Sequence, residues 1–138
     1  MSTVRAIFYF EAISNLASAA FALFFPATFL GQFVSEPLPI AAVEFGRWYA
    51  VLLIVLSLVL WAALREGGDW FLRRVIAAYL IGDALQIAVG VRLGLTVGAF
   101  PPAVHAAIWT SLVYAGVRIY YLRGLRGYGG SMSGAKPG

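Results

Sequence analysis

The chain has 138 residues, of which 62% are hydrophobic and 12% are charged, and its formal net charge is +4. A soluble domain is about half apolar and about a quarter charged, so this composition excludes an ordinary soluble domain and places the chain in a lipid bilayer. Cysteine is absent from the sequence, which excludes disulfides, thiolate nucleophiles and Cys-ligated zinc. The arginines are scattered at the ends of apolar runs and form no basic face, so the net positive charge does not indicate a nucleic-acid partner.

The first apolar run predicts a transmembrane helix over residues 6–25, which Pro26 closes. A hydrocarbon core about 30 Å thick needs roughly 20 helical residues, so this run is long enough to cross it. Residues 27–34 are apolar but too few to span, and we predict an interfacial loop or a short helix there. A cleavable signal peptide is the alternative for the N-terminal segment, but Glu11 and Asn15 would interrupt its apolar core.

Three further apolar runs predict transmembrane helices over residues 41–64, 75–97 and 103–122. The sequences "SEPLP", "REGGDW" and "GAFPP" supply the turn residues between the runs. Because these links are short, we predict that residues 1–122 form a single transmembrane domain of four helices. Residues 123–138 are basic, Gly-rich and without periodicity, and we expect a disordered tail that touches anionic headgroups.

The positively charged residues are distributed unevenly between the two ends of these spans. Only Arg47 and Arg92 fall at the end opposite the termini. The other eight, at the end that holds both termini, are Arg5, Arg65, Arg73, Arg74, Arg118, Arg123, Arg126 and Lys136. The positive-inside rule then predicts a multi-pass protein of the plasma (inner) membrane with both termini in the cytoplasm.

Each predicted span carries one stripe of polar, aromatic or small residues at helical spacing. The stripes contain Glu11, Asn15 and Ser18 in the first span, Glu44, Arg47 and Trp48 in the second, Tyr79, Asp83, Gln86 and Gly90 in the third, and His105, Trp109 and Gly116 in the fourth. A charged side chain facing lipid costs about 3 kcal/mol or more, so the stripes should face one another. We therefore predict an all-α membrane protein, a four-transmembrane-helix bundle with a polar interior.

Two roles are open for each of these polar residues. Asp83 is either an acid, base or cation ligand in a cavity, or half of a buried ion pair with Arg47 that fixes helix register. Glu11 has the same two roles, and it lies close enough to the membrane surface to reach water. Glu44 and Arg47, three residues apart, favour a structural pair near the outer surface.

The remaining candidates also have structural alternatives. His105 is typical of a hydrogen-bonded interfacial histidine. Gln86 and Asn15 are amides that commonly bridge helices, and Trp48 and Trp109 are typical of an aromatic belt. No His or carboxylate spacing indicates a metal site, and no nucleotide or phosphate motif is present in the sequence, so we predict no cofactor.

Taken together, these residues predict a cavity that binds a lipophilic small molecule and moves a proton on it. The catalytic candidates are Asp83, Glu11, Glu44 and His105, and the binding candidates are Arg47, Asn15, Gln86, Tyr79, Trp48 and Trp109. One neutral and one ionised carboxylate would suit isomerisation, cyclisation or epoxide opening on an isoprenoid-, polyketide- or sterol-like substrate. The expected partners are membrane lipid and such a substrate.

Two other classes of function remain open. Small four-span exporters that work as dimers carry one essential glutamate in the first span, and Glu11 has a similar placement, so a proton-coupled transporter acting as a homo-oligomer is one alternative. A structural or accessory membrane subunit, in which the polar stripes only specify helix pairing, is the other.

The first span runs into a proline at "FALFFP", and the second span begins with an arginine and ends in a charged Gly hairpin at "FGRWYAVLLIVLSLVLWAALREG". In these features the chain resembles the DoxX-like group of small four-helix bacterial membrane proteins. The resemblance implies the architecture of the spans and no functional residues. Sterol isomerases and membrane terpene cyclases are similar only in that they place acids inside a small helical bundle.

Overall fold

The computed structural model describes residues 2–34 and 37–129, and the main chain of this part forms five α-helices and no strand. The helices are α1 (Ser2–Phe24), α2 (Pro26–Leu30), α3 (Ile40–Arg65), α4 (Asp69–Val97) and α5 (Pro102–Gly129). The four long helices match the four predicted runs apart from a few residues at their ends, and the short α2 overlaps the segment 27–34 predicted as an interfacial loop or short helix. The largest differences are at two helix ends: α4 begins at Asp69 and not at residue 75, and α5 continues through residues 123–129 of the predicted tail. Residues 130–138 lie outside the described part of the chain.

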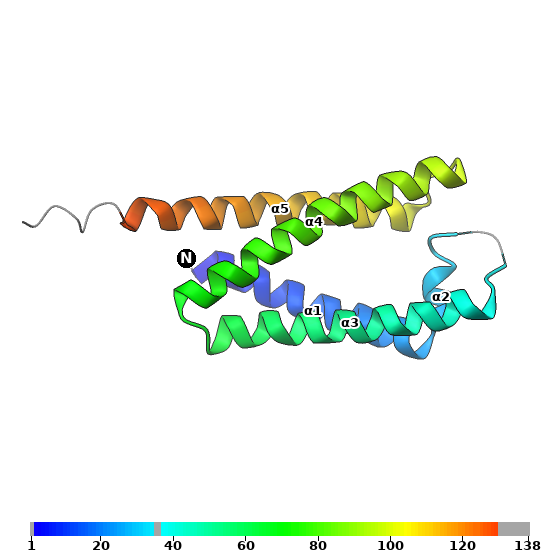
Figure 1. The fold of residues 1–138 in the computed structure, drawn as a ribbon, viewed down its shortest axis with the longest axis horizontal. Coiled ribbons are helices and arrows are strands. Elements are labelled where there is room, and N and C mark those ends of the chain that lie inside the picture. The colour runs from blue at the N-terminus through cyan, green and yellow to red at the C-terminus, as the bar shows by residue number, and fades with distance from the viewer. Residues whose placement is uncertain (1, 35–36, 130–138) are drawn as a thin grey trace, which may run out of the picture.

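The long helices are arranged as two antiparallel pairs, α1 with α3 and α4 with α5 (Figure 1). We call them the α1/α3 pair and the α4/α5 pair. Helix α4 starts beside the α1/α3 pair and crosses α5 obliquely in this view, and the two pairs diverge toward the end that holds α2.

The two pairs contact each other mainly at the opposite end, near the link between α3 and α4. A cluster of buried side chains joins them there, and it consists of Phe8, Ala12, Leu60, Ala63, Leu64, Leu72, Val75, Ile76 and Tyr121. Within it the rings of Phe8 and Tyr121 meet edge to face at 5.7 Å between centroids, a geometry that aromatic pairs favour. The Tyr79 hydroxyl donates a hydrogen bond to the Leu56 carbonyl and so ties α4 to α3.

Glycines permit both sharp turns of the α3–α4–α5 segment. A Cβ atom on Gly67 would lie 2.5 Å from the Ala63 carbonyl oxygen, so a side chain does not fit in the α3–α4 link. Gly98 caps α4 with a φ of 69°, a left-handed conformation that glycine adopts without a steric penalty. After that cap the chain folds the Phe100 ring against Gly94, which brings α5 back along α4.

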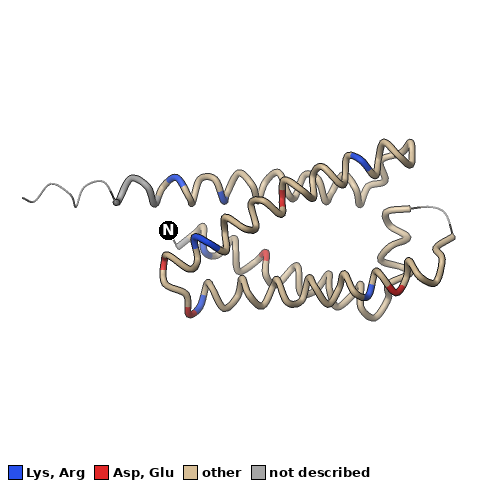
Figure 2. The backbone as a smooth tube through the Cα atoms, in the orientation of Figure 1, with Lys and Arg blue, Asp and Glu red and all other residues tan. Residues whose placement is uncertain are grey.

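In the part of the chain that the structure describes, three helices are long and apolar enough to cross a membrane, which indicates a membrane location. They are Thr3–Phe24, Ile40–Arg65 and Asp69–Val97, and many large apolar side chains on their outer faces are exposed. Helix α5 is 28 residues long but is not among these candidates, because polar and charged residues such as His105, Arg118 and Arg123 lower its mean hydropathy. Figure 2 shows that most charged residues lie toward the ends of the helices. Glu11, Asp83 and Arg118 are the buried charged residues of the described part.

Candidate functional site

The centre of the site is Arg118, which extends from α5 into the junction of the two helix pairs. Its side chain is 0% exposed and forms ion pairs with Glu11 of α1 and Asp83 of α4. The side chains of Glu11 and Asp83 are 5% and 11% exposed. We call these three residues the charged triad, and it connects three helices from both pairs.

Arginine suits this position because its planar guanidinium presents several N–H donors in a fixed fork. The Nη1 atom donates to Asp83 and the Nη2 atom donates to Glu11. The guanidinium carbon also lies 5.2 Å from the centre of the Tyr79 ring and 5.4 Å from that of Tyr114. These distances are within the range in which an aromatic face attracts a cation, so both rings help to stabilise a charge removed from water.

The triad is not fully satisfied in charge or in hydrogen bonding. Two carboxylates share one guanidinium, so the ionised triad carries one uncompensated negative charge. The Oε2 atom of Glu11 is buried and has no hydrogen-bond partner. Because a buried polar atom without a partner costs roughly 1–3 kcal/mol, the Glu11 carboxylate is a place where a ligand or a proton would be stabilising.

A cavity of about 730 Å³ lies between the two helix pairs and reaches the triad. Its polar lining consists of Glu11, Asn15, Ser18, Gln32, Tyr49, Tyr79, Asp83, Gln86, Thr110, Ser111 and Tyr114. Most of its remaining lining is aliphatic, including Leu52, Leu56 and Val59 of α3. Arg118 is not part of the lining, so among the described side chains the cavity has two carboxylates and no cation. Its volume is within the range of about 300–1,000 Å³ that small-molecule pockets occupy.

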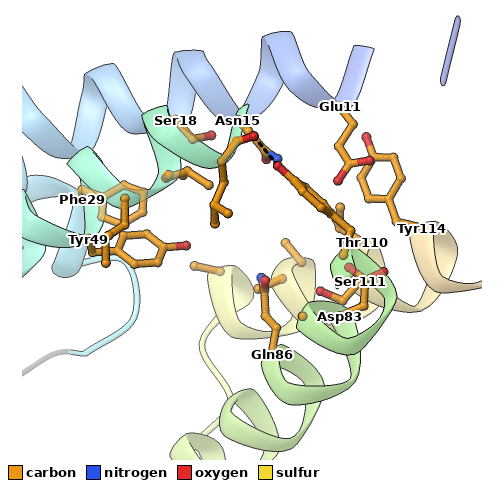
Figure 3. A pocket seen from close by; sticks show the side chains of 18 of the residues that line it. Glu11, Asn15, Ser18, Phe29, Tyr49, Asp83, Gln86, Thr110, Ser111 and Tyr114 are labelled. Atoms are coloured by element: carbon orange, nitrogen blue, oxygen red, sulfur yellow. Dashed lines mark hydrogen bonds between the residues drawn. The ribbon is translucent and has the colours of Figure 1, made fainter. Parts of the chain in front are cut away.

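The two ends of the cavity differ in chemistry (Figure 3). At one end the side chains of Glu11, Asp83 and Ser111 lie together, and at the other lie the rings of Phe29 and Tyr49. Helix α2 positions Phe29, whose ring stacks on that of Tyr49 with centroids 6.4 Å apart. The cavity therefore has a negatively charged end and an aromatic end.

Five of the residues that the sequence analysis selected line this cavity. They are Glu11, Asn15, Tyr79, Asp83 and Gln86, and they come from α1 and α4. For these two helices, the stripe chosen from the sequence is the face that lines the cavity.

The other five candidates, Glu44, Arg47, Trp48, His105 and Trp109, do not line the cavity. Trp48 and Trp109 are 69% and 65% exposed, so they face outward from the bundle. His105 is exposed, and its ring lies 5.6 Å from that of Phe100. On α3 and α5 the stripe chosen from the sequence is therefore not the face that lines the cavity.

The proposed pair between Arg47 and Asp83 is wrong. Arg47 pairs with Glu44 on the same helix, and the two side chains are 44% and 53% exposed, which agrees with the predicted structural pair. Asp83 is paired by Arg118 instead. The reason is the packing of the helices: α4 pairs with α5, which carries Arg118, whereas the N-terminal end of α3, which carries Arg47, diverges from α4.

Arg118 is absent from the predicted site residues because in the sequence it falls among the basic residues at the predicted cytoplasmic end of the spans. A signal for it is nonetheless present, since Ser111, Tyr114 and Arg118 follow one another at i, i+3 and i+7 and so share one face of a helix. On α3 the lining residues Tyr49, Leu52 and Leu56 have the same spacing. That stripe is mostly apolar, so the sequence does not distinguish it from the other faces of α3, which are also mostly apolar.

No protein-family model, curated protein or solved structure matches this sequence. The resemblance to the DoxX-like group therefore stays a prediction. Within residues 2–34 and 37–129, no group of three His, Asp or Glu side chains is placed to hold a metal ion. The chemistry that the described side chains offer is that of two carboxylates held by one arginine at the end of a largely apolar cavity.

Proposed function

We propose that this protein crosses the plasma membrane four times, with α5 as the fourth span and both termini in the cytoplasm. Arg118 lowers the hydropathy of α5, but its charge is buried between two carboxylates and need not contact lipid. Trp109, Val113 and Tyr120 on the outer side of α5 are 65%, 62% and 70% exposed, so this helix offers an apolar surface to the bilayer.

We further propose that the protein binds a lipophilic small molecule in the cavity between the helix pairs and that the carboxylates of Glu11 and Asp83 exchange protons with it. The observation that carries this proposal is a mostly apolar cavity of about 730 Å³ with two carboxylates in its lining. In such a site apolar walls hold a ligand and a few polar groups orient it. A carboxylate near the ligand is a general acid or base. Because one guanidinium balances only one negative charge, one of the two carboxylates is free to take up a proton while the other stays ionised.

The binding proposal is tested by filling the cavity. Ala107 lines it on α5, whereas Ala88 on α4 is exposed and outside its lining. Small molecules extracted from the purified Ala107→Trp, Ala88→Trp and unchanged proteins are compared by mass spectrometry. We expect a stoichiometric molecule in the unchanged protein and in Ala88→Trp and its loss from Ala107→Trp. If all three proteins carry only bulk phospholipid, the binding proposal is wrong.

The acid–base step is tested by proton exchange. The protein with its bound molecule is incubated in D2O, and the extracted molecule is analysed by mass spectrometry for deuterium bound to carbon. A carboxylate that removes a proton from carbon and returns one would replace that hydrogen with deuterium. We expect deuterium with the unchanged protein and with Glu44→Gln, whose carboxylate is outside the cavity, and none with Asp83→Asn. Equal incorporation by Asp83→Asn in a folded protein would rule out Asp83 as the exchanging group.

A structural role is the second candidate, and the charged triad itself favours it. Arg118 connects α1, α4 and α5, and the two pairs have their other main contacts in the same half of the molecule. In this role the triad would hold the pairs together and the cavity would contain only lipid. The extraction experiment distinguishes the two roles, because only the binding role expects a stoichiometric molecule.

A further inference from the structure

We infer that the ligand of this cavity carries a cationic nitrogen, such as a protonated amine on an apolar body, and that this nitrogen is held between Glu11 and Asp83. This inference rests on the proposed binding function and names the class of ligand. It also specifies the orientation, with the charged group at the triad and the apolar body toward Phe29 and Tyr49 (Figure 3).

The first argument is the balance of charge. Glu11 and Asp83 both line the cavity, and the single arginine that pairs with them lies behind them, 0% exposed and outside the lining. The described lining contains no cation. A cationic ligand would neutralise the remaining negative charge, whereas an anionic ligand would add a third negative group to a site of low dielectric.

The second argument is an open hydrogen-bond acceptor. The Glu11 side chain is 5% exposed, its Oε1 atom accepts from Arg118, and its Oε2 atom has no partner. An ammonium group has three donors and no acceptor, so it matches an unpartnered carboxylate oxygen. Tyr114 and Ser111, which line the cavity beside the carboxylates, offer further oxygen acceptors.

The third argument is the rest of the lining. Leu52, Leu56 and Val59 line the cavity along α3, and the Phe29 and Tyr49 rings line its far end. Burying the hydrocarbon part of a ligand against these walls is favourable, but their apolar side chains have no group that pairs with a second charge. The ligand class is therefore an amphiphile with one cationic end.

The experiment measures equilibrium binding of tritiated dodecylamine to the full chain in nanodiscs of phosphatidylcholine, with empty nanodiscs subtracted. Dodecanol and dodecanoate compete on the same sample. We expect saturable binding of one amine per chain, and we expect each competitor to be weaker than unlabelled amine by about tenfold or more, since a hydrogen bond between charged groups contributes at least that factor. Because this comparison uses the unchanged protein, it does not depend on whether a variant folds.

Variants then locate the site. Glu11→Gln and Asp83→Asn should each weaken amine binding by about tenfold or more, and Glu44→Gln, an exposed carboxylate outside the cavity, should leave it unchanged. Competition by dodecanol or dodecanoate as strong as by the amine would overturn the inference, and so would the absence of saturable amine binding. The extraction experiment with Ala107→Trp tests whether any small molecule is bound, and neither of these results changes its outcome. A failure of the amine inference is therefore distinguishable from a failure of the proposed binding function.

Discussion

At the scale of single residues, Arg118 has the largest expected effect on stability. Its side chain is 0% exposed and neutralises two carboxylates from other helices. Removing one partner from a buried ion pair costs about 3–5 kcal/mol, because the remaining charges are left unpaired away from water. We therefore expect Arg118→Met, which keeps most of the side-chain volume, to lose at least about 3 kcal/mol, measured by reversible unfolding in detergent.

Two further variants separate charge from packing at this position. Arg47→Met removes an arginine whose side chain is 44% exposed, and it should change stability by less than about 1 kcal/mol. The triple variant Glu11→Gln, Asp83→Asn, Arg118→Met removes all three charges together, and it should recover much of the stability that Arg118→Met loses, since a neutral replacement for a buried ion network is often tolerated. A triple variant no more stable than Arg118→Met would show that the unpaired carboxylates are not the cause of the loss.

At the scale of helices, Gly94 and Gly116 give opposite expectations for the same substitution. A Cβ atom on Gly94 would overlap the Phe100 ring that turns the chain from α4 into α5, whereas one on Gly116 would meet nothing within 4 Å. Gly94→Ala should therefore destabilise the protein by about 1–3 kcal/mol through overpacking. Gly116→Ala should stabilise it by up to about 1 kcal/mol through helix propensity. Thermal unfolding of the two variants checks both signs, and equal shifts would contradict the packing of Phe100 on Gly94.

The helices themselves are well predicted by the sequence, because a run of about 20 apolar residues bounded by Pro, Gly and charges has few other solutions in a bilayer. The sequence predicts which face lines the cavity for some of the helices and not for others. On α1 and α4 a carboxylate within an apolar helix marks the cavity side, as Glu11 and Asp83 do. On α3 the only carboxylate, Glu44, is satisfied by its neighbour Arg47 and needs no interior position, so its stripe is misleading.

The pairing of the triad is a separate problem, because it depends on which helices are neighbours. Four helices that each carry polar residues allow several pairings at similar depth, and the spacing along a single helix does not determine which pairing forms. Asp83 pairs with Arg118 and not with Arg47 because α4 packs against α5, whereas the N-terminal half of α3, which carries Arg47, diverges from α4. Both are properties of the assembled bundle and not of any one helix.

At the scale of the whole molecule, the number of membrane crossings determines how the triad and the cavity lie relative to the two sides of the membrane. Helix α5 is the long helix that hydropathy does not select as a span, although the charge of Arg118 is neutralised within the bundle. If α5 crosses, the C-terminal tail lies on the same side as the α3–α4 link. If it does not, the tail lies on the opposite side, together with the α4–α5 link.

The chain contains no cysteine, so single cysteines can be introduced without removing any native one. We place one at a time by Pro37→Cys, Gly68→Cys, Ala99→Cys and Ser133→Cys and treat intact cells with a membrane-impermeant maleimide. We expect labelling of the cysteines at 37 and 99 in intact cells and of those at 68 and 133 only after permeabilisation, as eight of ten basic residues at one end of the spans predict. Labelling at 133 together with 99 would mean that α5 does not cross. Arg118 could then not reach Glu11 and Asp83 within the membrane, so this result would contradict the charged triad as well as the topology.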